Sequence, residues 1–346
     1  MNRNENLPVG YETISQSFWK GRIDSKDNYD AFRWHQWVQC IDLNNIKKEN
    51  FNHKLGIAII GFCSDIGVER NKGRIGTANG PNSIRKELMN RPCAFDKSLK
   101  IYDAGNIIPF GKDLERAQKD LSHMVNRILN LGLFPIILGG GHAVALGHYH
   151  GLKQYLLNDN DKSKLGIINF DAHFDIRPYN NGGTSGTMFR QIADYCIANQ
   201  LPYNYLCLGI QRSGNTVDLF KTAHKLGAQY LLAKDIQNAD LWGITEKIDD
   251  FIKQNTDIYM TICADVFSSA NAPGVSAPQP LGIDPERAIK LIKHIVKSGK
   301  LISFDIAEVS PRFDLDNSTA SLAAVLIFSI VSTLASEHNL SIIYDI

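Results

Sequence analysis

Two aspartates and a histidine occupy alternate positions in the segment Asp171-Ala172-His173-Phe174-Asp175, soon after the apolar run 165–168. In an extended segment, side chains two positions apart point the same way. We therefore expect Asp171, His173 and Asp175 to converge at the carboxyl end of a buried strand. Mixed carboxylate and imidazole ligands suit manganese, iron, zinc or nickel. The alternative is a solvated turn that contains these residues by chance.

Two further segments place metal-ligand residue types after apolar runs. His142 follows three glycines at 139–141, which allow a sharp backbone turn after the run 134–138. A glycine turn alone is weak evidence, because many loops need one. Cys263 and Asp265 are two positions apart and follow the run 258–260, so both can face the first cluster.

Together these segments supply five candidate ligands from three predicted strand ends: His142, Asp171, His173, Asp175 and Asp265. A carboxylate-rich set of this size indicates two neighbouring metals, bridged by a carboxylate and a hydroxide, that activate water against an electrophilic carbon. Glu308 follows another apolar run. It is either a solvent-facing loop residue or the acid that meets a cationic group.

The elements that must position these residues are short apolar runs separated by amphipathic segments. Expected strands cover 57–62, 133–138, 165–170, 205–208, 258–263, 301–304 and 341–344, and expected helices include 114–131, 285–298 and 321–338. This alternation predicts an α/β fold with a parallel sheet covered on both faces. Sites in such sheets lie beyond the carboxyl ends of the strands. Pro135 places its strand at an edge or lies near the strand's start. We assign His148 and His150 to a helix or to a supporting layer around the site.

The chain divides by pattern at about residue 54. Residues 1–54 are polar, contain Trp19, Trp34 and Trp37, and are expected to form an extension with short helices packed on the core. Residues 55–346 contain no repeat and no low-complexity linker, so we expect one catalytic domain.

Composition limits the possible partners. The 346 residues include 37 basic and 36 acidic residues, which gives no electrostatic case for nucleic acid or an anionic membrane. The longest apolar run, 323–334, is expected to be too short for a membrane span. We expect no secretory signal, since no N-terminal apolar segment follows a basic start, and the six scattered cysteines are typical of reduced thiols. The expected location is the cytoplasm.

Six segments resemble the ureohydrolase family of arginase, agmatinase and formimidoylglutamase. They are residues 71–76, 80–85, 139–142, 171–175, 263–278 and 303–311. The resemblance covers about 55–346 in the same order, and segments 71–74, 185–190 and 272–278 are most similar to those of formimidoylglutamases.

The resemblance implies a three-layer α/β/α fold with a mostly parallel central sheet and two Mn²⁺ per subunit. His142, Asp171 and Asp175 would bind one metal, and His173, Asp171 and Asp265 the other. The implied reaction is hydrolysis of N-formimidoyl-L-glutamate to L-glutamate and formamide, in histidine breakdown, by a hydroxide between the metals. Asp171 and Glu308 would act in catalysis, and trimers or hexamers are expected.

Two positions depart from the family pattern. Cys263 stands where arginase and agmatinase have a bridging Asp, and Mn²⁺ prefers oxygen. Cys263 then either ligates a metal, weakens one site or becomes oxidised. Ser185 stands where those two enzymes have a His that is thought to shuttle a proton, which argues against their activities and leaves the proton donor unassigned.

A substrate with two carboxylates calls for arginine. Arg177 follows Asp175 by two positions and is the first candidate, since it would also repel a cationic tail such as that of agmatine. Arg190, Arg74 and Arg212 are further candidates, and Ser185 is placed in the same binding region. Two alternatives stay open: another guanidino-acid or agmatine-type ureohydrolase, and a member with a weakened metal centre and a non-catalytic role.

Overall fold

The computed structural model describes residues 8–157 and 163–342. Within them the strands are β1 (Tyr11–Glu12), β2 (Gln39–Cys40), β3 (Leu55–Phe62), β4 (Leu99–Ile107), β5 (Phe134–Leu138), β6 (Leu165–Phe170), β7 (Asn204–Ile210), β8 (Gln229–Leu232), β9 (Asp257–Cys263) and β10 (Leu301–Ala307). They form one sheet in the order β1-β4-β3-β5-β10-β9-β6-β7-β8, with β2 also paired to β4. β1 runs antiparallel to β4, and the other pairs are parallel.

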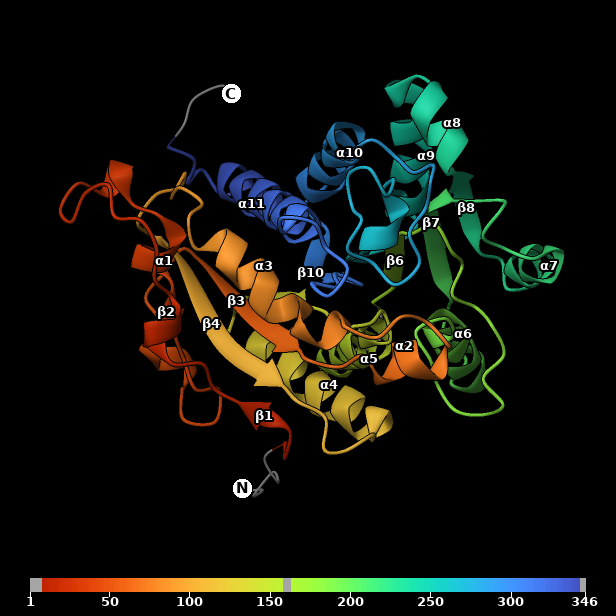
Figure 1. Cartoon of the computed structure of the whole chain (residues 1–346), viewed down its shortest axis with the longest axis horizontal. Helices are drawn as coiled ribbons and strands as arrows, with labels where there is room; N and C mark the ends of the chain where they lie inside the picture. The colour runs from red at the N-terminus through yellow and green to blue at the C-terminus, as the bar shows by residue number, and fades with distance from the viewer. Residues whose placement is uncertain (1–7, 158–162, 343–346) are drawn as a thin grey trace.

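Helices cover both faces of this sheet. They are α1 (Trp34–Trp37), α2 (Ile66–Arg70), α3 (Gly80–Leu88), α4 (Leu114–Asn130), α5 (Val144–Leu157), α6 (Met188–Ala198), α7 (Val217–Lys225), α8 (Ala233–Asn238), α9 (Leu241–Lys253), α10 (Pro285–Lys297) and α11 (Ser318–Glu337). Five short 3-10 helices lie in the described loops: η1 (Gln16–Phe18), η2 (Tyr29–Ala31), η3 (Lys48–Asn50), η4 (Thr77–Asn79) and η5 (Ala264–Val266). Helices α3, α10 and α11 pack together on one face, and α4, α5 and α6 on the other (Figure 1).

Alternate residues of β3 separate the two cores. Ile57 and Ile59 join the core that contains the α10 and α11 side chains, whereas Ala58 and Ile60 join the core that contains α4 and α5. A strand buried on both faces has this two-residue period. The expected three-layer α/β/α architecture with a mostly parallel sheet is therefore confirmed.

Most predicted strands appear within a few residues of their expected bounds. The edge position considered for Pro135 is wrong, because β5 lies between β3 and β10, but Pro135 is the second residue of its strand. There a missing amide donor is tolerated. The strand expected at 341–344 extends past the described residues, and its described part forms one bridge, from Ser341 to Phe95.

Strand β4 was not predicted, because polar residues interrupt its apolar pattern. Asp103 in its middle is fully buried and pairs with the buried Arg85, whose Nε lies 2.9 Å from Asp103 Oδ2. Trp19 Nε1 donates to the same oxygen at 2.8 Å. The N-terminal segment thus packs on β4 through Trp19. The division at residue 54 stays a prediction.

Helix α11 is longer than the apolar run suggested. Its 20 residues make it the one helix in the described ranges that is long and apolar enough to cross a membrane, by length and composition alone. In its apolar window 67% is buried inside the molecule, and α11 packs on α3 and α10. A long apolar helix inside a protein core has the same length and composition as a membrane span.

Candidate active site

Four neighbouring strands carry the predicted chemical residues. β5, β10, β9 and β6 are consecutive in the sheet, although they are far from consecutive along the chain. Parallel strands end at the same edge. Four segments therefore meet at this edge. They are the turn with His142, the loop with Asp171, the segment from Cys263 and the end of β10 with Glu308.

The loop after β6 brings its ligands together by turning. β6 ends at Phe170, so Asp171, His173 and Asp175 lie beyond the strand and not in an extended segment. Asp171 Oδ1 accepts a hydrogen bond from His173 N at 2.8 Å, and Asp175 has a left-handed φ of 51°. The expected convergence is found, but the strand-alternation argument for it is wrong.

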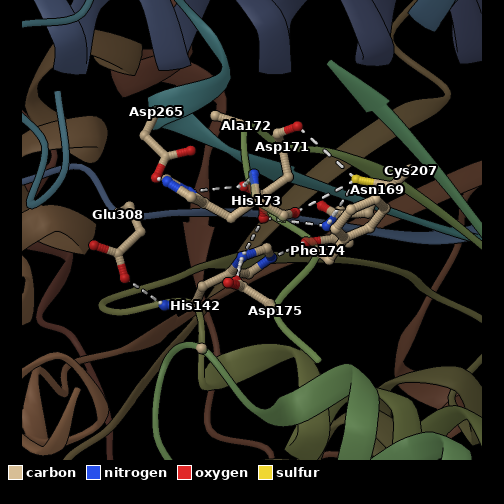
Figure 2. A network of polar contacts seen from close by, with 12 residues as sticks. His142, Asn169, Asp171, Ala172, His173, Phe174, Asp175, Cys207, Asp265 and Glu308 are labelled. Carbon is tan, nitrogen blue, oxygen red and sulfur yellow. Dashed lines mark hydrogen bonds and ion pairs between the residues drawn. The ribbon is translucent and has the colours of Figure 1, made fainter. Parts of the chain in front are cut away.

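Carboxylates surround each of the two histidines (Figure 2). His142 Nδ1 lies 3.0 Å from Asp171 Oδ2 and 3.1 Å from Asp175 Oδ2. His173 Nδ1 lies 3.1 Å from Asp265 Oδ2 and 3.6 Å from Asp171 Oδ1. Asp171 is thus shared, with one oxygen directed to each histidine.

This cluster fits a pair of divalent metal ions. Donor atoms of Asp171, His173 and Asp265 lie within 4.8 Å of one another, and those of His142, Asp171 and Cys263 do so as well. Asp265 Oδ1 is buried and has no hydrogen-bond partner among the described residues, which a cation would satisfy. Oxygen and nitrogen donors dominate both sets, as manganese and related ions require.

The sets match the predicted ligands closely. The second set is the predicted trio of His173, Asp171 and Asp265. In the first, Cys263 occupies the place expected for Asp175, although the Asp175 carboxylate still contacts His142. Cys263 is the last residue of β9, and Asp265 lies in the 3-10 helix that follows.

Buried charges in the cluster shift one another's pKa values. Burial disfavours the charged form of His173, but Asp265 and Asp171 outweigh it and raise its pKa to about 12. Burial, together with the nearby Asp171, raises the pKa of Asp175 to about 6. Burial and the same carboxylate raise the pKa of the Cys263 thiol well above its ordinary value. The direction of these shifts shows that negative charge is concentrated in the cluster, where a cation would be favoured.

Glu308 is a buried acid at the end of β10, not the solvent-facing loop residue that was the alternative. Its Oε1 accepts from His142 N at 2.8 Å, and its own amide donates to Gly140 O at 2.8 Å. Its backbone is left-handed, with φ 67°. Burial raises the pKa of its carboxyl group to about 8.

One cavity collects most of these side chains. Its lining consists of Asn71, His142, His173, Asp175, Arg177, Ser185, Cys263, Asp265, Ser276, Ala277 and Glu308. Arg177 and Ser185, both predicted to bind substrate, thus share a cavity with the candidate metal ligands. Glu308 lines it as well, so an acid and a guanidinium are available to one ligand.

The other predicted arginines lie outside this cavity lining. Arg74 Nη2 donates to Val275 O at 2.6 Å, and its guanidinium lies over the Phe313 ring, 4.1 Å from the centroid. Arg190 pairs with Asp194 at 3.1 Å. Arg74 therefore contacts the 272–278 loop, and Arg190 forms an ion pair within α6.

Three lining residues were not singled out from the sequence: Asn71, Ser276 and Ala277. Asn71 is the C-terminal cap of α2, and its Oδ1 accepts from Thr184 Oγ1 at 3.3 Å. The side-chain carbonyl is thereby engaged, which leaves the amide donor for a ligand. Their position within the motif segments 71–76 and 263–278 is the sequence feature that could have identified them as lining residues.

Fold and site together define a class: an α/β enzyme whose mostly parallel sheet presents candidate carboxylate and imidazole metal ligands at its carboxyl edge. More specifically, the chain belongs to the arginase family, because residues 55–332 match the model of that family.

Individual relatives agree with this assignment. The chain is 55% identical to a formimidoylglutamase of Clostridium tetani over 337 residues, which cover 97% of this chain and all of that one. It is 43% identical to a formimidoylglutamase of Geobacillus sp. over 315 residues, 91% of this chain and 94% of the relative. The crystal structure of formimidoylglutamase from Bacillus subtilis matches with a TM-score of 0.76 at 23% identity, over 92% of this chain and 97% of that one. A Trypanosoma cruzi formiminoglutamase solved with Mn²⁺ matches with a TM-score of 0.73 at 22% identity, over 86% and 99%.

Proposed function

We propose that this protein is a formimidoylglutamase, which hydrolyses N-formimidoyl-L-glutamate to L-glutamate and formamide. The observation that carries the proposal is the 55% identity to a protein of that name over its whole length. The cavity supports it with its own chemistry, since an acid and a guanidinium line the same space as the candidate metal ligands.

The reaction makes one bond and breaks another. A water oxygen adds to the amidine carbon, and the bond from that carbon to the glutamate nitrogen then breaks. The nitrogen leaves with a proton as the amine of glutamate, and the carbon leaves as formamide. Water is the only co-reactant, so no oxidant or further cofactor is needed.

Charge complementarity favours this substrate over cationic ones. The amidinium is positive, and the other end of the substrate carries two carboxylates. Glu308 would meet the amidinium, whose charge favours the ionised carboxylate over the protonated form. Arg177 would pair with a carboxylate through its planar fork. An agmatine-like tail ends in a cation, which Arg177 would repel.

We propose that the metal is manganese, with two ions per subunit. His142, Asp171, Asp175 and Cys263 would hold one ion, and Asp171, His173 and Asp265 the other. When bound, such ions act as Lewis acids and lower the pKa of a coordinated water. A formiminoglutamase structure with Mn²⁺ among the related folds supports this choice of metal.

A substrate panel tests the activity. The purified protein is loaded with Mn²⁺ and offered formimidoylglutamate, agmatine, arginine and a guanidino acid, while formamide, urea and ammonia are measured separately. We expect formamide and glutamate in equal amounts from formimidoylglutamate alone. Urea from any guanidino compound at a higher kcat/KM would replace the proposal with a ureohydrolase acting on that compound. Metal-stripped enzyme is the control.

The second candidate is a member with a weakened metal centre and a non-catalytic role. The observation in its favour is Cys263, a buried thiol among hard oxygen ligands. Metal analysis distinguishes the two: fewer than about one ion per chain after incubation with Mn²⁺ favours the non-catalytic role.

Location and assembly are proposals too. We propose a cytoplasmic enzyme, which the six cysteines support, since all are unpaired in the structure. The family resemblance supports a homo-oligomer, trimer or hexamer, which light scattering on the purified protein would test. Small-molecule substrates are the expected partners.

A further inference from the structure

A buried hydrogen-bonded chain lies behind His142, on the side away from the candidate metals. His142 Nε2 lies 3.0 Å from Thr261 Oγ1, and Thr261 Oγ1 donates to Asp305 Oδ1 at 2.6 Å. Thr261 and Asp305 are register partners on the neighbouring strands β9 and β10. All three side chains are at most 1% exposed. The proposed chemistry does not use Thr261 or Asp305.

The direction of each hydrogen bond follows from counting protons. A carboxylate can only accept, and a threonine hydroxyl has one proton. Because that proton points to Asp305, Thr261 Oγ1 can only accept from His142. The Nε2 of His142 therefore carries a proton, which leaves Nδ1 as the nitrogen that can bind a metal.

That nitrogen faces the proposed metal site. His142 Nδ1 is the atom that lies 3.0 Å from Asp171 Oδ2 and 3.1 Å from Asp175 Oδ2. Burial opposes the charged ring, but the two carboxylates outweigh it and raise the pKa of His142 well above its ordinary value, so in the metal-free protein Nδ1 also carries a proton, which a metal ion would displace. We infer that Thr261 and Asp305 are positioning residues: they hold His142 in the tautomer whose Nδ1 binds metal. This inference rests on the proposed metal centre.

The other oxygen of Asp305 keeps the carboxylate oriented. Asp305 Oδ2 accepts from Tyr259 OH, and His148 Nδ1 lies 2.6 Å from it. With two donors at Oδ2, an asparagine at this position would place its carbonyl there and its amide toward Thr261. The amide would then donate to Thr261, whose own proton would turn to His142 Nε2. Asp305→Asn thus reverses the direction of these hydrogen bonds. It favours the tautomer of His142 that carries its proton on Nδ1, the nitrogen that would bind metal.

The experiment measures the Kd of each Mn²⁺ site by calorimetry on metal-free protein. Thr261→Val removes the hydroxyl at nearly constant shape, and Thr261→Ser retains it. The matched control is Thr333→Val on α11, where a buried threonine hydroxyl donates to Ser329 O at 2.7 Å. Circular dichroism and the Tm of the metal-free proteins check that each variant folds.

We expect Thr261→Val and Asp305→Asn to weaken one of the two sites by about 10- to 100-fold, the effect typical of losing a metal ligand's hydrogen-bond partner. Thr261→Ser and Thr333→Val should stay within about 3-fold of the wild type. Equal Kd values for wild type and Thr261→Val would overturn the inference, as would equal weakening by Thr333→Val. Failure of the wild type itself to bind Mn²⁺ would instead overturn the proposed metal centre.

Discussion

The Glu308 carboxylate accepts a hydrogen bond from the backbone amide of His142, with 2.8 Å between Oε1 and N. This contact ties the end of β10 to the turn after β5. It holds an acid beside a candidate metal ligand, although 166 positions separate the two residues. Because one carboxylate oxygen is engaged by the backbone, the other is left for a cationic substrate.

Replacing Glu308 by Gln should lower kcat/KM for formimidoylglutamate. Gln keeps an acceptor for the His142 amide but loses the charge that pairs with the amidinium. Loss of a buried charge partner costs about 2–5 kcal/mol, or roughly 30- to 5,000-fold. Steady-state kinetics measure this loss, with Mn²⁺ content as the control. Unchanged kcat/KM would remove Glu308 from the substrate contacts.

The same variant should change how the stability of the metal-free protein depends on pH. The pKa of Glu308 is raised to about 8 in the folded protein from an ordinary value of 4.5. Between these pH values the unfolded chain releases this proton and the folded protein keeps it, so wild-type stability falls as pH rises from about 4.5 to 8. Glutamine does not titrate.

The unfolding free energy of Glu308→Gln, relative to that of the wild type, should therefore increase from pH 5 to pH 8 by on the order of 2–4 kcal/mol. Above pH 8 the difference should level off. Urea denaturation of both proteins at several pH values measures it. A pH-independent difference would contradict the raised pKa.

Arg177→Gln should raise KM for formimidoylglutamate more than it lowers kcat, because Arg177 would bind the part of the substrate that does not react. A hydrogen bond to a charged group contributes about 1.5–3 kcal/mol, which corresponds to roughly 10- to 150-fold in KM. Arg22→Gln, at an exposed N-terminal position, is the control. If Arg190→Gln has the larger effect, the carboxylate site lies by α6 instead.

Cys263→Asp should tighten the binding of one Mn²⁺. Burial and neighbouring carboxylates hold the thiol protonated, so a metal must displace that proton before the sulfur can bind. A carboxylate ionises more readily and is the harder ligand. We expect the Kd measured by calorimetry to fall by at least about 10-fold. Cys263→Ser is the neutral control. Unchanged metal content in Cys263→Asp would show that residue 263 does not contact the metals.

Local patterns were sufficient for most strands and for selecting the candidate ligands. β6 begins with the continuous apolar run 165–168, and α10 has a helical period with Asp284 as its N-terminal cap. β4 escaped prediction because its buried Asp103 is stabilised by Arg85, a partner from another element. A local sequence pattern does not show this pairing, because the two residues meet only in the folded chain.

Local sequence patterns specify which residues are available for chemistry and that they follow strands, because short apolar runs and glycine turns mark strand ends. Which strand ends meet is set by the folded arrangement of the sheet. The order β5-β10-β9-β6 depends on long-range pairing, and it brings Glu308 to His142 and Thr261 to Asp305. It also decided which arginine faces the ligands, because Arg74, Arg177 and Arg190 have the same side chain and differ only in what surrounds them.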